Sequence, residues 1–130
     1  MKSKYSLQDV FRIIDSGDRK RVWFSAPKKS VEAVISVYAG SGKPKTQSEA
    51  TEFILAGIKS LKETDFVQSL VLWNDPKCIG DVYGCLYDGH PWYVKFRVDE
   101  DGDLDELSFH LPEHEIKTVG GKKIPKGDIK

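Results

Sequence analysis

Residues 79–111 read IGDVYGCLYDGHPWYVKFRVDEDGDLDELSFHL, and they give the clearest indication of the fold. It contains three runs rich in β-branched and aromatic residues, from Ile79 to Tyr87, from Trp92 to Val98 and from Leu104 to Leu111. Asp88-Gly89-His90-Pro91 separates the first two runs, and Asp99 to Asp103 separates the last two. Both connections are rich in residues that favour β-turns. The pattern therefore predicts a three-stranded antiparallel meander.

The residues before the meander predict helices and further strands. Ser6 and Thr46 each begin a capping motif ahead of apolar residues at helical spacing. Ser30 can cap a third helix, although its β-branched content leaves a strand possible. The expected elements are helices from Ser6 to Gly17, from Ser30 to Gly40 and from Thr46 to Leu61, and strands from Arg21 to Ser25 and from Asp65 to Trp73. We therefore expect an α+β fold with helices packed on one face of a twisted antiparallel sheet.

Length and composition indicate one folded domain. The chain has 130 residues, of which 39% are hydrophobic and 31% charged, as in ordinary globular proteins. No apolar run approaches the roughly 20 residues of a membrane helix, and the N-terminus lacks the apolar core of a secretory signal. We expect a cytoplasmic protein with a single domain over residues 1–115. Residues 116–130 are rich in Gly and Lys and predict a basic, mobile tail.

The net charge is zero, but the charges are unevenly distributed. Lys and Arg exceed Asp and Glu by six over residues 1–45 and by three over residues 114–130, whereas acidic residues exceed basic ones by nine over residues 46–113. The basic ends predict either an anion-binding rim or ordinary surface charge. Cys78 and Cys85 are too few for a disulfide framework or a four-cysteine zinc site, so we expect reduced packing residues.

Side chains alternate between the two faces of a strand, so each run of the meander divides into two sets. One set is apolar and is expected to pack beneath the helices: Val82, Leu86, Trp92, Val94, Phe96, Val98, Leu107, Phe109 and Leu111. The other set is polar and aromatic: Asp81, Tyr83, Cys85, Tyr87, Tyr93, Lys95, Arg97, Glu106, Ser108 and His110. Tyrosine rings, cations and histidine provide stacking surfaces, phosphate ligands and proton transfer, which suits RNA. The alternative is a solvated sheet face with cross-strand ion pairs.

Four motifs follow one another in the second half of the chain: Glu63-Thr64-Asp65-Phe66-Val67-Gln68-Ser69, Asp81-Val82-Tyr83, Trp92-Tyr93-Val94-Lys95 and Leu107-Ser108-Phe109. Their order and approximate spacing resemble the MqsR family of RelE-like toxins, from Ile58 to Glu113. The resemblance implies a RelE-like fold and the toxin of a type II toxin-antitoxin system. Such a toxin is a metal-independent endoribonuclease that cleaves mRNA, free or on the ribosome, and is neutralised by a cognate antitoxin. No cofactor, metal or membrane is implied.

The resemblance also implies roles for single residues. Tyr93 matches the active-site tyrosine of the family, and Lys95 follows on the same face. Gln68 and His110 stand where the family usually has lysines, and Gly80 stands where it usually has a glutamine. We expect Tyr93 and His110 to exchange protons, Lys95 to bind the scissile phosphate and Gln68 to position it.

Three further residues complete the predicted site, with Arg97 as a second phosphate ligand and Tyr83 and Tyr87 as RNA-stacking residues. The alternative function is a non-catalytic RelE-like module that binds protein or RNA, because several family positions differ and fold does not determine function.

Overall fold

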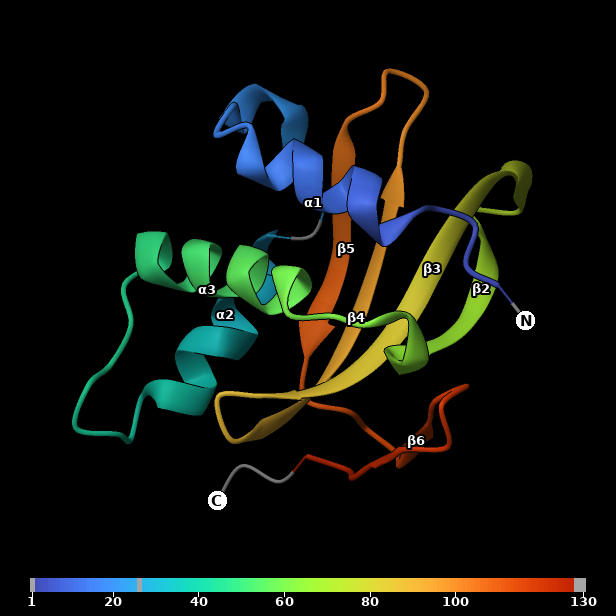
Figure 1. The fold of residues 1–130 in the computed structure, drawn as a ribbon. Helices are drawn as coiled ribbons and strands as arrows, with labels where there is room; N and C mark the ends of the chain where they lie inside the picture. The colour runs from blue at the N-terminus through green and yellow to red at the C-terminus, as the bar shows by residue number, and fades with distance from the viewer. Residues whose placement is uncertain (1, 26, 128–130) are drawn as a thin grey trace.

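The computed structural model describes residues 2–25 and 27–127, which form an α+β fold (Figure 1). The helices are α1 (Leu7–Asp15), α2 (Pro27–Tyr38) and α3 (Gln47–Lys59), with short 3-10 helices at η1 (Arg19–Arg21) and η2 (Glu63–Asp65). The strands are β1 (Val22–Phe24), β2 (Phe66–Leu72), β3 (Asp75–Tyr87), β4 (His90–Val98), β5 (Leu104–His110), β6 (Ile116–Lys117) and β7 (Lys123–Ile124). The predicted meander is therefore present as β3, β4 and β5.

Five strands form the main sheet in the order β1-β5-β4-β3-β2, and β6 pairs with β7 in a separate hairpin. Strands β2 to β5 are antiparallel neighbours, but β1 runs parallel to β5. The sheet is thus mixed, and the prediction of a wholly antiparallel sheet was wrong at this edge. Strand β1 pairs with a strand about 80 residues away, and such a long-range pairing leaves no local signal in the sequence.

Local capping signals placed two of the helices correctly. The Ser6 hydroxyl accepts a hydrogen bond from the Asp9 amide at the start of α1, and Thr46 forms a capping box with Glu49 at the start of α3. Ser30 does not cap α2, which begins three residues earlier. Its side chain is buried and donates instead to the Glu106 carboxylate at 3.0 Å. A tertiary contact has replaced the predicted local one.

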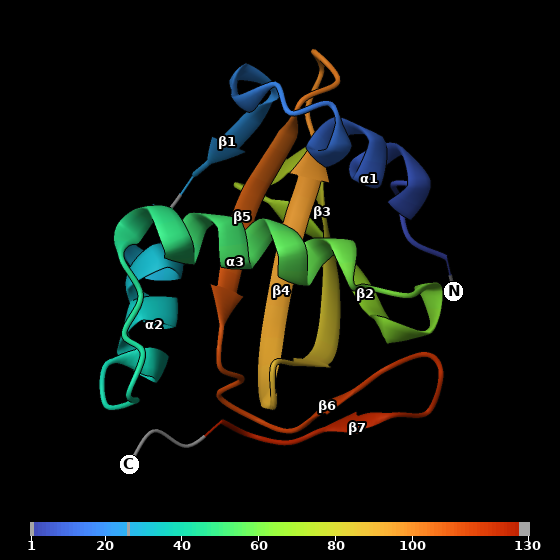
Figure 2. The same ribbon diagram turned by 60° about the vertical axis from the view of Figure 1, so that its left-hand side comes forward.

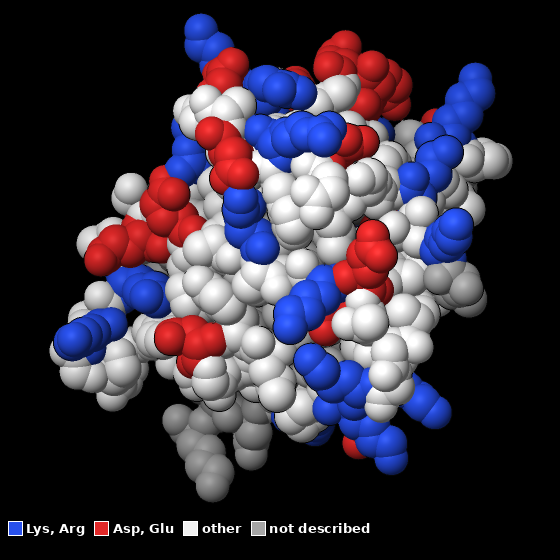
Figure 3. Space-filling view, viewed as in Figure 1, with Lys and Arg blue, Asp and Glu red and all other residues white. Residues whose placement is uncertain are grey.

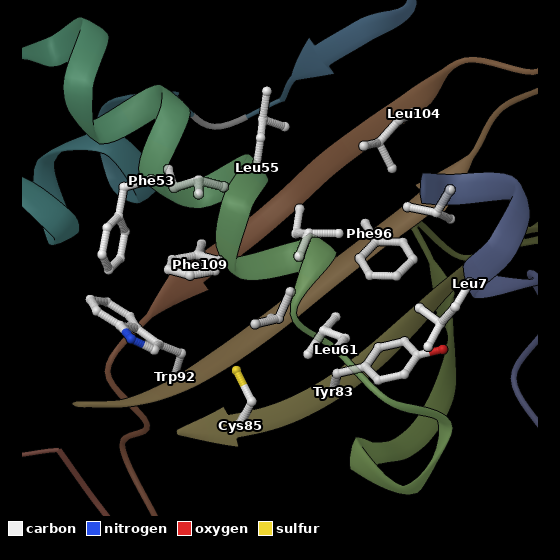
Figure 4. Close-up of a cluster of buried hydrophobic side chains, with 14 of the residues drawn as sticks. Leu7, Phe53, Leu55, Leu61, Tyr83, Cys85, Trp92, Phe96, Leu104 and Phe109 are labelled. Atoms are coloured by element: carbon white, nitrogen blue, oxygen red, sulfur yellow. The ribbon is translucent and has the colours of Figure 1, made fainter. Parts of the chain in front are cut away.

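The helices cover one face of the sheet, and the core lies between the two layers (Figure 2). Phe53 of α3 contacts Trp92 of β4 and Phe109 of β5 at ring-centroid distances of 5.5 and 6.1 Å (Figure 4). Gly57 brings α3 close to the sheet, because a Cβ atom there would lie 2.7 Å from the Phe109 ring. This close packing fixes the position of β4 and β5 beneath the helix layer.

We call the sheet face directed away from the helices the outer face. Tyr93, Lys95 and His110 lie on it, as predicted. The prediction for β3 was wrong, because Tyr83 and Cys85 pair with Val94 and Trp92 and are buried on the helix side with them.

Glu106 is also on the helix side rather than the predicted polar face. A bulge between β4 and β5 explains this change. Lys95 is opposite Ser108, but the next residue, Phe96, is opposite Glu106, so Leu107 is an extra residue in β5. Such a bulge reverses the face on which the preceding residues project.

The C-terminal segment differs from the mobile tail that its composition predicted. Residues 116–127 pass across the sheet end as the β6–β7 hairpin (Figure 2). Ile124 is fully buried, and Ile116 and Ile124 both lie against Gly84 on the outer face of β3. The Val119 amide donates to the Phe66 carbonyl at 2.8 Å, which ties the hairpin to β2. Residues 128–130 of the predicted tail lie outside the described residues.

No helix within the described ranges is long and apolar enough to cross a membrane.

Candidate active site on the outer face of the sheet

Strands β4 and β5 bring three predicted catalytic residues together. Tyr93 is directly opposite His110, and Lys95 is directly opposite Ser108. Directly opposed residues of an antiparallel pair project to the same face, so all four side chains lie on the outer face. Cβ atoms of such pairs are about 5 Å apart, and the two pairs are adjacent on that face.

These side chains line a pocket of about 350 Å³. The strands form its floor, and the chain that leaves β5 toward β6 forms its rim. Its lining consists of Tyr93, Lys95, Ser108, His110, Pro112, Glu113, His114, Glu115 and Ile116. We call this cavity the outer pocket. It combines a lysine, a phenol, two imidazoles and two carboxylates, which together can transfer protons and stabilise negative charge.

The His110 ring is held in a defined orientation. Its Nδ1 lies 2.8 Å from the Leu111 carbonyl oxygen, and its ring stacks on Tyr93 with centroids 5.0 Å apart and planes 17° apart. A carbonyl oxygen can only accept a hydrogen bond, so Nδ1 carries the proton in this contact. The other ring nitrogen, Nε2, is then the atom that can accept a proton from a ligand.

Tyr93 is half-buried at the pocket floor. Burial raises the pKa of its phenol above the ordinary value of 10.0, because the charged phenolate is poorly solvated there. The hydroxyl therefore keeps its proton at neutral pH. It can donate a hydrogen bond or a proton, but it is a poor base.

Arg97 projects to the same face but is already engaged by carboxylates. Its Nε donates to Asp105 at 3.2 Å, its Nη1 lies 3.4 Å from Glu100, and its guanidinium stacks over Trp73. Although burial alone would lower the pKa of Arg97, its bonds to Asp105 and Glu100 raise it. It is absent from the pocket lining. The structure thus gives Arg97 a structural ion pair instead of an open phosphate-binding position.

Gln68 is exposed on β2 and also faces outward, because it pairs with Val82, which in turn pairs with Lys95. Two strand spacings separate Gln68 from Lys95, or roughly 10 Å. Gln68 does not line the outer pocket. The predicted role of this residue in positioning the phosphate therefore has no support from its location.

Tyr83 and Tyr87 do not face the outer pocket. Tyr83 is fully buried and stacks on Phe96 within the core (Figure 4). Tyr87 packs against Phe53 on the helix side. Neither ring lines the outer pocket, because β3 presents the opposite face to the one predicted for these residues.

Sequence reasoning missed the pocket rim. No role was predicted for Glu113, His114 or Glu115. All three are exposed and line the pocket. The signal that could have indicated them is the cluster of acidic and imidazole side chains immediately after the strand that carries His110.

Other hollows and acidic groups lie apart from these residues. A hollow of about 450 Å³ is lined by residues 2–6, Glu63 and Phe66, and it contains none of the predicted site residues. The turn between β4 and β5 places oxygens of Asp99, Asp101 and Asp103 within 4.8 Å of one another, a spacing that could hold a metal ion. However, Asp99 accepts hydrogen bonds from the amides of Asp101 and Asp103, so the cluster already stabilises its own turn.

Comparison of the chain with protein-family models and with curated proteins found no match. The resemblance to MqsR therefore rests on the four sequence motifs. The chemistry of the outer pocket is therefore the feature of the structure that bears on function.

Proposed function

We propose that this protein is an endoribonuclease of the RelE-like toxin type, similar to MqsR, that cleaves mRNA in the outer pocket. The supporting observation is that Tyr93, Lys95 and His110 line one pocket from two neighbouring strands. The motifs include Tyr93 and Lys95, whereas His110 stands where the family usually has a lysine and is supported by its chemistry and its place in the pocket. The three side chains provide the proton acceptor, proton donor and cation that phosphodiester cleavage requires.

In the proposed reaction, Nε2 of His110 removes the proton from the ribose 2′-OH. The 2′-oxygen then bonds to the adjacent phosphorus, and the bond from phosphorus to the 5′-oxygen breaks. Tyr93 protonates the departing 5′-oxygen, and Lys95 stabilises the charge on the phosphoryl oxygens. The products are a 2′,3′-cyclic phosphate and a 5′-hydroxyl. Proton exchange with water restores neutral His110 and protonated Tyr93, so the protein needs no metal in this scheme.

The raised pKa of Tyr93 agrees with its assignment as the acid, because the phenol is protonated before the reaction begins. The contact between His110 and Leu111 supports its assignment as the base, because it leaves Nε2 available. Gln68 and Arg97 have no direct part in this mechanism, since neither lines the pocket.

The test is cleavage of purified mRNA, with and without ribosomes, by the wild type and by Tyr93→Phe, Lys95→Gln and His110→Ala. Each substitution should lower the cleavage rate by about 10²-fold or more. Gln68→Ala is the matched control, since it changes an outward residue outside the pocket and should cleave at the wild-type rate. Cleavage should persist with a metal chelator and leave cyclic phosphate ends. Equal RNA survival with all proteins and without protein would refute the proposal.

The same proposal predicts toxicity in cells. Induction of the protein should arrest growth in a manner that depends on His110, and a cognate antitoxin encoded by an adjacent gene should relieve the arrest. Wild-type protein that arrests growth no more than His110→Ala would contradict the toxin assignment.

A second candidate is a non-catalytic RelE-like module that binds RNA or protein. The observation that favours it is the engagement of Arg97 by Asp105 and Glu100, which leaves Lys95 as the cation in the pocket lining. This second function would be supported if the protein binds RNA tightly but leaves it intact under all the conditions above.

A further inference from the structure

The β6–β7 hairpin has two chemically different sides. Ile116 is paired with Ile124, and both side chains lie against Gly84 of the sheet. Lys117 is paired with Lys123, and side chains alternate along a strand. The two lysines therefore project together away from the sheet, and both are exposed.

This pairing places like charges directly opposite each other, with Cβ atoms about 5 Å apart. Like charges in this position destabilise a strand pair, and a hairpin with two residues in each strand has little pairing to offset the cost. Within residues 2–25 and 27–127, neither lysine forms an ion pair. Residues 116–127 contain no carboxylate, and of their other two lysines Lys122 is already paired with Asp65 at 3.6 Å. An external anion would offset this repulsion.

The hairpin is joined directly to the outer pocket. Ile116 belongs both to β6 and to the pocket lining, and the Gly127 amide donates to the carbonyl of Pro112, another lining residue. Figure 3 shows Lys and Arg side chains gathered at the bottom of the view, where Figure 1 places β6. A chain bound in the pocket can therefore continue over this basic surface.

We propose that the outward side of the β6–β7 hairpin, centred on Lys117 and Lys123, binds the phosphates of single-stranded RNA whose cleaved nucleotide lies in the outer pocket. This inference rests on the proposed function. A flexible polyanion fits the surface, because lysines spread along a hairpin contact successive phosphates without reading bases. A membrane surface fits less well, because Val119 is the only large apolar side chain exposed among the described residues of this hairpin.

The test compares Lys117→Gln/Lys123→Gln with Lys28→Gln/Lys29→Gln. The control pair is exposed on α2, in the helix layer, and changes the net charge equally. Both are made in the His110→Ala background so that the RNA stays intact. Binding of a 20-nucleotide single-stranded RNA is then measured by fluorescence anisotropy from 50 to 300 mM salt.

The hairpin variant should lose about tenfold in affinity at 50 mM salt, and its plot of log K against log salt should be shallower by about 1.4. The control should match its parent. The melting temperature of the hairpin variant should equal or exceed that of the parent, because the substitution removes a repulsion, so weaker binding will not reflect unfolding. Equal affinities and salt slopes for the two variants would overturn the inference.

Two further measurements separate this inference from the proposed function. A dinucleotide has one phosphodiester, which lies in the pocket when it is cleaved, and no further phosphate for Lys117 and Lys123, so its cleavage by the wild type tests the pocket alone. If the wild type cleaves the dinucleotide but the hairpin variant binds RNA as tightly as its parent, the proposed function stands and the RNA-binding role of the hairpin is refuted. Vesicles containing phosphatidylserine should bind weakly. Vesicle binding as tight as RNA binding, and lost in the same variant, would overturn the RNA assignment.

Discussion

Glu106 offers the sharpest test of the structure, because it is a carboxyl group in the core. It is fully buried between α2 and β5, where one oxygen accepts a hydrogen bond from Ser30 at 3.0 Å. Its other oxygen, Oε1, has no hydrogen-bond partner among the described residues. Burial raises the pKa of Glu106 from 4.5 to about 8, and the nearby charge of Asp105 adds to the rise, whereas the Ser30 bond opposes it.

The raised pKa predicts how stability depends on pH. The folded protein holds the Glu106 proton up to about pH 8, whereas the unfolded chain releases it near pH 4.5. The folded state therefore binds more protons between these values, and its stability falls as pH rises through this window. A pKa difference of about 3.5, at about 1.4 kcal/mol for each pH unit, corresponds to about 5 kcal/mol lost above pH 8. About 3 kcal/mol of this is already lost at pH 7.

Glu106→Gln removes the charge and keeps an oxygen that can accept from Ser30. Urea unfolding should give free energies within about 1 kcal/mol of each other for the two proteins at pH 5. At pH 8.5 the variant should be more stable by about 3 to 5 kcal/mol. Glu113→Gln is the control, because Glu113 is exposed, and it should show no such gain. Equal stabilities of the wild type and Glu106→Gln at pH 8.5 would refute the burial argument.

Three other predictions concern packing. Gly57→Ala should destabilise the protein by about 1 to 3 kcal/mol in urea unfolding, because the added Cβ would lie 2.7 Å from the Phe109 ring. A gain in stability would contradict the close approach of α3 to the sheet. Ile124→Ala should cost about 2 to 4 kcal/mol and speed amide exchange at Val119, whereas a mobile tail would show neither effect. Iodoacetamide at pH 8 should label Cys78 but not Cys85 in the folded protein, and both in urea, because burial raises the pKa of Cys85 to about 12.

The candidate site shows which part of a pocket can be predicted from residues in sequence. The shared outward face of Tyr93, Lys95 and His110 was predicted correctly, because alternation along β4 and β5 is short-range and no bulge separates these residues. The rim of the pocket could not be found in this way. Its residues follow the last long strand, and only the path of the chain toward β6 brings them over the sheet.

By itself, the sequence determined the features that depend on neighbouring residues: the capped starts of α1 and α3, the turns of the meander and the outward face of β4. Tertiary structure alone decided the parallel pairing of β1, the inward face of Tyr83, the burial of Glu106 and the folding of residues 116–127. Each of these depends on the free energy of contacts between residues far apart in the chain. A hydrophobic pattern shows that a side chain can be buried, but the surface that buries it is supplied by the rest of the fold.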